Sequence, residues 1–422
     1  MRVITRAMCW LAFGLSTTCG ELRAFPAESP SLSRADLESL ALQHHPAIAE
    51  AQAKLQSLHG KWQQMGLPPN AVIGYSGQQL WSGGAAEQQG LYVAQKFVRG
   101  GKLALNREVV CREMERANRE WAIQHQKVIT DVGLAHNDAW FAEQRVQLAG
   151  QLRKIAQDAQ QSAKRLYQAQ EVSQLDVLRA RGELELAEIA ERSAQESQRA
   201  AWGRLTAVVG LPELAMQPLT DSQLADETPF DPEATFARLL DSSPELAAAR
   251  ADVDRAGWAW RRATVESVAD VDVQSVVQHD NATNGANAIV QVTLPLALWN
   301  RNQGGIRQAR SELAAAEQAT RRVELGLRQR WAAVYQAYAT AHHRVEEYQA
   351  PDGVLATAQQ ALDLVTRGYK AGELDYLNLL SAQQMYSQAK LAYLEAQRDE
   401  RAAEIELRGW LLKESLSPAA TG

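Results

Sequence analysis

One stretch of sequence occurs twice, and its two copies constrain the fold more than any other feature. Arg165–Leu178 recurs 202 residues later as Arg367–Leu380, with Arg, Tyr, Ala, Glu and Leu at the same spacing in both copies. Each copy separates two long segments of helical pattern by a few residues that can turn. A repeated unit has to be recognised first, because missing it misassigns the whole fold. The sequence therefore predicts a duplicated helical hairpin.

The composition favours long helices over a sandwich or an α/β enzyme. Of 422 residues only 13 are proline and 6% are aromatic, so the core is expected to consist of seams between helices. The net charge of -6 argues against a nucleic-acid partner. We find no Gly-rich phosphate loop, no nucleophile elbow and no paired carboxylates in a likely cleft. Neither enzyme activity nor a cofactor is therefore expected.

The N-terminus has the pattern of an export signal. Residues 1–27 are predicted to be a signal peptide, since two arginines precede the short apolar run Met8–Leu15. Acylation of Cys19, in a stretch similar to a lipoprotein cleavage site, is the alternative way of processing this leader. Beyond the leader only Cys111 remains, which predicts no internal disulfide and no cysteine metal cluster. We expect Cys111 to be buried on a helix.

Two pairs of segments change from a helical period to strict alternation. Residues 71–81 and 89–98 form the first pair, and residues 267–279 and 287–298 form the second. Each segment has about the ten residues that a tilted strand needs to cross a bilayer. In 267–279 valines alternate with Asp and Gln, a pattern typical of a wall with lipid outside and water inside. No segment has eighteen uninterrupted apolar residues, so no transmembrane helix is predicted.

The helical segments also follow one order twice. A first repeat, 28–216, contains a helix, a β-hairpin and the helical hairpin 102–209. A second repeat, 217–413, has the same order with the helical hairpin 303–412, and 414–422 is a tail. From Val128 to Leu166 apolar or small residues recur at spacings of three and four, half of them Ala, which predicts close helix packing along nearly 60 Å. Taken alone, this stripe is also compatible with any antiparallel coiled coil.

Taken together, these residues resemble the TolC family of outer-membrane efflux proteins. The resemblance rests on the tip Tyr369–Leu377, its partner Tyr167–Leu175 and the strand-to-helix junctions Arg99–Lys102 and Asn300–Gly305. Val209–Pro212 is similar to the family's end of the first repeat. The likeness extends over roughly residues 31–413, and the duplicated order of elements contributes most to it.

The resemblance implies a mainly α protein with a membrane β-barrel part. Four strands in each chain of a homotrimer would close a 12-stranded β-barrel in outer-membrane lipid, continued by a periplasmic α-helical barrel. Such a protein is the exit duct of a tripartite efflux system. It passively conducts substrates delivered by a periplasmic adaptor (membrane fusion) protein and an inner-membrane efflux pump, and the heavy-metal efflux branch is one group of such systems. The alternative is a periplasmic coiled-coil scaffold or interaction protein without a pore.

The resemblance also assigns roles to residues of the two repeated stretches. Asp176 matches an acidic gate position and Tyr369 a gate tyrosine, while Asn378 and Ser381 stand where paired aspartates line the best-known member's constriction. The arginine that partners the gate acid there corresponds to Leu374. Gln170 replaces the tip glycine that is kept at Gly372, which predicts a tighter or more helical first turn. The residues expected at the periplasmic tip and its adaptor contact are Arg165, Tyr167, Gln170, Glu171, Ser173, Arg367, Tyr369, Gly372, Glu373 and Asp375.

Two further sets of residues have competing interpretations. Arg99 and Lys102 follow a strand, where they could bind lipid headgroups or simply begin a helix and add solubility. The eight histidines lack carboxylates or cysteines at a convincing ligand spacing, and no metal site is expected.

Overall fold

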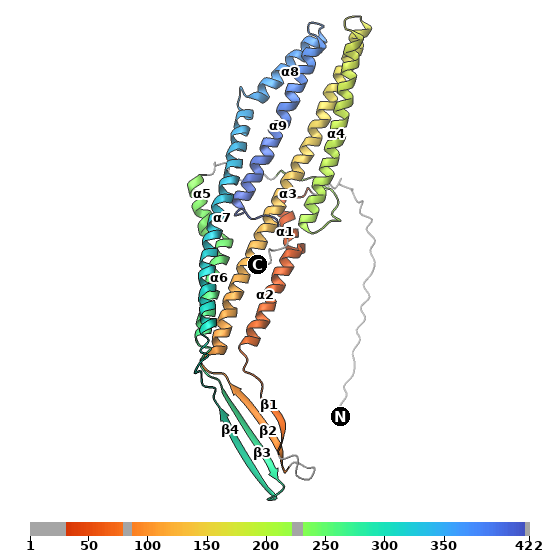
Figure 1. Ribbon diagram of the computed structural model, residues 1–422. Helices are drawn as coiled ribbons and strands as arrows, with labels where there is room; N and C mark the ends of the chain where they lie inside the picture. The colour runs from red at the N-terminus through yellow and green to blue at the C-terminus, as the bar shows by residue number, and fades with distance from the viewer. Residues whose placement is uncertain (1–30, 79–86, 222–230, 418–422) are drawn as a thin grey trace, which may run out of the picture.

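The protein is an elongated bundle of helices with a small β-sheet at one end and two helical tips at the other (Figure 1). The computed structural model describes residues 31–78, 87–221 and 231–417. The signal peptide, Cys19 and the end of the tail lie outside these residues. In chain order the elements are α1 (Arg34–His44), α2 (Pro46–Met65), β1 (Val72–Gln78), β2 (Gln88–Phe97), α3 (Lys102–Gln168), α4 (Gln174–Val209), α5 (Pro232–Ser242), α6 (Pro244–Thr264), β3 (Val271–Asp280), β4 (Gly285–Thr293), α7 (Gln303–Gln349), α8 (Val354–Lys370) and α9 (Tyr376–Arg408).

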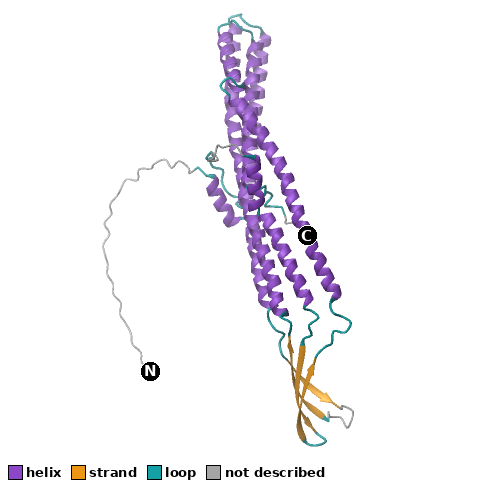
Figure 2. Ribbon diagram, turned by 90° about the vertical axis from the view of Figure 1, so that its left-hand side faces the viewer, coloured by secondary structure: helices purple, strands orange, loops and turns teal. Residues whose placement is uncertain are grey.

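The strands form one twisted antiparallel sheet in the order β1-β2-β3-β4 (Figure 2). The central pair joins the two halves of the chain, with Phe97 opposite Val271 and Gln88 opposite Asp280. Within the described residues β1 and β4 each pair on one side only. One face of the sheet carries large apolar side chains in the open, including Ile73, which is 72% exposed. The predicted two-sided strand pattern is therefore present.

The ends of two strands differ from the prediction. The segment 287–298 forms a strand only to Thr293, because Pro295 has no N–H to donate to the neighbouring strand. The segment 267–279 is a strand only from Val271, because the end of α6 continues as a turn in which the Val268 N–H donates to the Val265 carbonyl over 3.0 Å. Of the segment 71–81, residues 79–81 lie outside the described residues.

Prolines and caps set the helix boundaries near the N-terminus. The segment expected as one bent helix is divided into α1 and α2, because Pro46 cannot donate an N–H to continue α1. The His45 side chain caps α2 by accepting the Ala47 N–H at 3.2 Å. Ser33 and Asp36 form a complete capping box at the start of α1, which confirms the predicted cap.

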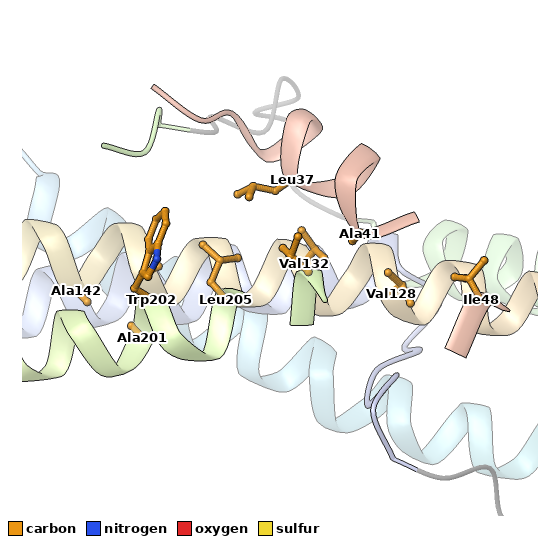
Figure 3. Packing of buried hydrophobic residues seen from close by; sticks show 11 residues of the cluster. Leu37, Ala41, Ile48, Val128, Val132, Ala142, Ala201, Trp202 and Leu205 are labelled. Carbon is orange, nitrogen blue, oxygen red and sulfur yellow. The ribbon is translucent and has the colours of Figure 1, made fainter. Parts of the chain in front are cut away.

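Small and branched side chains pack α1, α3 and α4 together near the middle of the molecule. Leu37 of α1, Val128 and Val132 of α3 and Leu205 of α4 are completely buried there (Figure 3). Each such side chain contributes about 1.5–3 kcal/mol through burial. The alanines expected along the seam, such as Ala139, are also buried, which lets the helix backbones approach closely. Cys111, expected to be buried, is only half-buried on α3.

The long helices differ in continuity. α3 runs without interruption for 67 residues. Its counterpart in the second half is divided into α7 and α8 by Ala350–Gly353, where Pro351 interrupts the helical hydrogen bonds and the Gly353 N–H donates to the Ala350 carbonyl over 2.8 Å.

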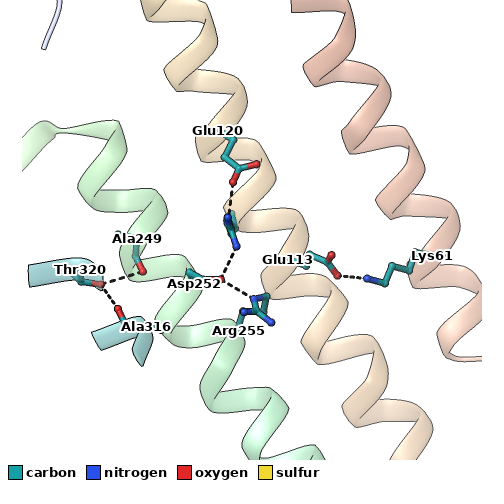
Figure 4. A network of polar contacts seen from close by, with 9 residues as sticks. Lys61, Glu113, Glu120, Ala249, Asp252, Arg255, Ala316 and Thr320 are labelled. Carbon is teal, nitrogen blue, oxygen red and sulfur yellow. Dashed lines mark hydrogen bonds and ion pairs between the residues drawn. The ribbon is translucent and has the colours of Figure 1, made fainter. Parts of the chain in front are cut away.

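Close to the sheet, polar contacts join α3 to α6 on one side and to α2 on the other. Arg116 of α3 donates to Asp252 of α6 and to Glu120, both over 2.9 Å (Figure 4). On the other side of α3, Glu113 pairs with Lys61 of α2 over 2.6 Å.

Where α3 meets the sheet, a partly buried ion pair joins the two halves of the chain. Lys102 lies 2.9 Å from Asp270, and the same carboxylate accepts the Arg99 N–H at 3.1 Å. Lys102 is 6% exposed, so of its two interpretations the structure favours the structural one. The Asp270 carboxylate thus lies beside the start of α3, where a negative charge is favourable, although α3 has no side-chain cap.

Candidate functional site: the two helical tips

Two turns form the end of the molecule opposite the sheet (Figure 1). We call residues 165–178, between α3 and α4, the first tip, and residues 367–380, between α8 and α9, the second tip. The tips are neighbours, because a Cβ placed on Gly372 would lie 3.5 Å from the Glu171 carboxylate.

The two tips have the same backbone. In the first, the N–H groups of Ala169, Gln170 and Glu171 donate to the carbonyls of Arg165, Tyr167 and Leu166 over 2.9 to 3.0 Å. In the second, the equivalent N–H groups of Ala371, Gly372 and Glu373 donate to the equivalent carbonyls over 2.9 to 3.1 Å.

The expectation that Gln170 changes the first turn is wrong. Gln170 has a φ of 62° and Gly372 a φ of 77°, so both occupy the left-handed region. A residue with a Cβ enters this region at a cost of about 1–2 kcal/mol. The hydrogen bonds of the turn and the helices on either side hold Gln170 there despite that cost.

Each tip also begins its second helix with a side-chain cap. Ser173 and Asp176 form a capping box in the first tip: the Ser173 N–H and hydroxyl donate to Asp176 over 3.1 and 2.8 Å. In the second tip, Asp375 accepts the Asn378 N–H at 3.0 Å. The acidic side chain is therefore at the third helical position in the first tip and at the N-cap in the second. This difference is a local reason for Asn378, rather than an acid, at the third position of α9. Arg179 lies 3.8 Å from Asp176 and is its nearest cation among the described residues.

The tips differ in their tyrosines. Tyr167 is 45% exposed, whereas its equivalent Tyr369 is 1% exposed. Tyr369 packs edge-on against Tyr376, 2% exposed, with ring centroids 6.0 Å apart. Both rings lie in a cluster with alanines of α3 and α4, so the second tip is inserted against the first helical hairpin.

Neither buried tyrosine hydroxyl has a hydrogen-bond partner among the described residues. Burial, followed by the nearby Glu183 carboxylate, raises the pKa of Tyr376 to about 12. Burial, followed by Asp176, raises the pKa of Tyr369. Two neutral hydroxyls are therefore held close to the carboxylates of α4.

The remaining predicted site residues are distributed over the tip surface. Asn378 and Ser381 are exposed on α9, and Asp176 is half-buried at the start of α4. The other residues predicted for the tips are exposed around the two turns: Arg165, Gln170, Glu171, Ser173, Arg367, Gly372, Glu373 and Asp375. Tyr376 was not predicted as a site residue; its one signal in the sequence is an aromatic residue where the first repeat has Gln174.

A cavity of about 390 Å³ lies between the two hairpins behind the tips. Its walls combine apolar residues such as Leu152 and Leu186 with polar ones such as Glu183, Gln383 and Tyr386. On α4, Leu175, Leu178 and Ile189 are each more than half exposed. This apolar stripe at helical spacing has no partner within the described part of the chain.

Histidines and carboxylates do not assemble into a metal centre in the described residues. His342 lies 2.6 Å from Glu400, which is an ion pair when the imidazole is protonated. His136 is 1% exposed, and burial lowers its pKa to about 4. Among the described residues, no helix has the length and hydropathy of a membrane span.

The fold is shared with solved outer-membrane channel proteins. A membrane protein from Pseudomonas aeruginosa superposes with a TM-score of 0.76 at 16% identity, covering 90% of each chain. VceC, an outer membrane protein of Vibrio cholerae, gives 0.73 at 17% identity, covering 90% of this chain and 96% of VceC. At these identities the likeness defines the class of fold.

The second half of the chain is similar to a known protein family. Residues 236–411 match the family described as outer membrane efflux protein. The cobalt-zinc-cadmium resistance protein CzcC of Cupriavidus metallidurans is 31% identical over 269 residues. Both matches agree with the resemblance seen in the sequence. The match to CzcC extends over 60% of this chain and 60% of CzcC.

Proposed function

We propose that the protein is the outer-membrane exit duct of a tripartite efflux system. One observation carries the proposal: a sheet with an exposed apolar face and helical tips with a closed packing stand at opposite ends of one continuous bundle. A periplasmic scaffold has no use for such a sheet, whereas a duct needs both a membrane end and a closable end. Conduction through it is passive, and the chain acts without a cofactor or catalytic group.

The proposed duct is a homotrimer. In lipid, the unpaired edges of β1 and β4 would leave backbone N–H and C=O groups unsatisfied, each costing several kcal/mol. Three copies of the sheet closed edge to edge give a 12-stranded barrel. The two halves, 28–216 and 217–413, act as structural repeats that wrap around the same axis. Their common order of hairpin and long helices supports this arrangement.

The tips are proposed to close the periplasmic end and to contact an adaptor protein. Tyr369, Asp176, Asn378 and Ser381 are the gate candidates. The insertion of Tyr369 against the first hairpin supports a closed resting state. The exposed turn residues leave a polar rim that an adaptor coupled to an inner-membrane pump can contact.

The proposed cargo is divalent transition-metal ions. The relative CzcC is named for cobalt, zinc and cadmium resistance. The described residues contain no assembled metal centre, and such a duct needs none, because a metal bound tightly would not leave. Selection would then belong to the pump. Signal-peptide removal near residue 27 precedes assembly, and acylation of Cys19 is the other proposed route.

Fractionation of cells expressing the full chain tests the duct. The proposal expects heat-sensitive trimers in the outer membrane and ion conductance in planar bilayers. A soluble periplasmic monomer without conductance would instead support a coiled-coil scaffold and refute the duct. Deleting the gene should sensitise cells to cobalt, zinc or cadmium; unchanged tolerance of all three, with conductance intact, would refute the metal cargo alone.

A further inference from the structure

The two free edges of the sheet define a pairing between copies of the chain. Resting on the proposed trimer, we propose that residues 293–298 of one copy pair with β1 of the next in a single antiparallel register. In that register Leu298 is opposite Ile73 of the next copy and Leu296 is opposite Tyr75. The register follows from the correspondence between the two halves of the chain.

Helix boundaries on either side of each hairpin fix this correspondence. The first strand of each hairpin follows α2 or α6, which begin at Pro46 and Pro244, and whose Trp62 and Trp260 are likewise 198 residues apart. The second strand precedes α3 or α7, whose N-caps Gly101 and Asn302 are both left-handed and stand 201 residues apart. Strand β1 therefore maps onto β3 with an offset of 198, and β2 onto β4 with an offset of 201.

The pairing within the two hairpins checks these offsets independently. Tyr75 is opposite Leu91 in the first hairpin. With the offset of 198, Tyr75 corresponds to Val273, and with the offset of 201, Leu91 corresponds to Val292. Val273 and Val292 are opposite each other in the second hairpin. The helix ends thus reproduce a strand register that was not used to obtain them.

The strand pairing between the two halves of one chain then predicts the strand pairing between two copies. Strand β2 pairs with β3 where the first half meets the second, so β4 should pair in the same way with β1 where one copy meets the next. Phe97 is opposite Val271. Adding 201 to Phe97 gives Leu298, and subtracting 198 from Val271 gives Ile73, so these two residues are expected to be opposite each other. In the same way Gln95 and Val273 become Leu296 and Tyr75.

In the single chain residues 294–298 lie beyond β4, and the Leu298 N–H donates to the Leu296 carbonyl over 2.9 Å. Extended as the register requires, this segment would place its side chains on the matching face of β1. Ile73, Tyr75, Leu296 and Leu298 are all at least 59% exposed in the single chain. Ile73 is in one cross-strand row with Val93, Ser275 and Val290, which places it on the face of the even-numbered residues of β4. Slipping the register by one residue would place apolar side chains opposite residues of the other face. The pairing also explains why the alternation of leucines continues beyond Thr293, where β4 ends in the single chain.

Cysteine cross-linking in the full-length protein tests the register. Residues directly opposite in an antiparallel pair have Cα atoms about 4.5–5.5 Å apart, within the range of a disulfide. The double variants Ile73→Cys/Leu298→Cys and Tyr75→Cys/Leu296→Cys should shift most of the chain into reducible multimers on mild oxidation. The matched controls Ile73→Cys/Leu296→Cys and Tyr75→Cys/Leu298→Cys move one partner by two residues, and the four single variants reveal any link to a native cysteine.

Each outcome decides one point. Efficient linkage of the first two pairs and little linkage of the controls supports the register. Preferential linkage of a control pair overturns it, and so does the absence of linkage in all four pairs when the variants have the size of a trimer before oxidation. If the unmodified protein is itself a monomer of native size in detergent, the proposed trimeric duct fails, which is a separate result.

Discussion

The first and second tips have one backbone and bury different side chains. Their turn hydrogen bonds and left-handed residue are equivalent, yet Tyr167 is 45% exposed and Tyr369 is 1% exposed. The repeated sequence therefore determines the shape of the turn, while the surroundings determine what each copy does. A tyrosine at the same position is a surface residue in one tip and part of the core in the other.

The residue that begins the second helix contributes to the difference. In the second tip it is Tyr376, whose ring packs against Tyr369, and in the first tip the equivalent residue is the exposed Gln174. Ala163 and Ala180, both completely buried, belong to the same cluster. An aromatic pair on one hairpin and small residues on the other thus produce an asymmetric contact from two similar motifs.

Truncating the aromatic pair should have the largest effect. Tyr376→Ala removes a buried ring and leaves a cavity, which should lower the free energy of unfolding by about 3–5 kcal/mol. Thermal unfolding, together with hydrogen exchange at α8 and α9, measures the loss. Tyr167→Ala is the matched control and should change stability by less than about 0.5 kcal/mol. Equal losses for the two variants would remove the distinction between the tips.

High pH should loosen the second tip. The pKa of Tyr376 is raised to about 12 in the folded protein and is near 10 in the unfolded chain. Its contribution is therefore fully present below pH 10 and is lost as the pH rises toward 12, amounting to roughly 2–3 kcal/mol. Hydrogen exchange of α8 and α9 across this range should show the loss in the wild type. In Tyr376→Phe the loss of stability at high pH should be smaller than in the wild type. If the two proteins have the same pH profile, groups other than Tyr376 cause the loss.

A charge change at Asp176 separates its cap from its proposed gate role. Asp176→Asn keeps an oxygen that can accept the Ser173 N–H, so the helix start should survive and little leak is expected. Asp176→Arg reverses the charge and removes the carboxylate half of the capping box, which should cost about 1 kcal/mol and increase the closed-state conductance in planar bilayers. An unchanged closed conductance in Asp176→Arg would count against any gate role.

The smallest effect concerns the left-handed residue. Gly372→Gln gives the second tip the residue of the first and should destabilise it by about 1 kcal/mol, while Gln170→Gly should stabilise the first tip by a similar or smaller amount. Ala371→Gln is the control, because Ala371 has a φ of -82°. Chemical denaturation measures all three, and a Gly372→Gln variant no less stable than Ala371→Gln would show that the turn does not need glycine.

The sequence predicted the features that depend on local pattern. The tips follow from the repeated stretch, the strands from alternation, and the buried seam of α3 from its alanines. The cap at Ser33 follows from Asp36 three residues later. Each of these depends on residues close together in the chain, where spacing alone carries the information.

Features that depend on distant residues were missed or wrong. The burial of Tyr376 requires the alanines of the first hairpin, and the ion pair of Lys102 requires Asp270 from the other half of the chain. Gln170 was judged by its own conformational preference, which the rest of the turn overrides. The end of β4 was predictable from Pro295, but the leucines continue to alternate after it, and the strand was therefore predicted to extend to residue 298.

The unbroken course of α3, compared with the division between α7 and α8, has a mechanical consequence. At about 1.5 Å per residue, α3 is a rod of about 100 Å from the sheet to the first tip. In the second half the break at Ala350–Gly353 interrupts the corresponding path, so α7 and α8 do not form one lever, and α9 is the unbroken helix that reaches the second tip.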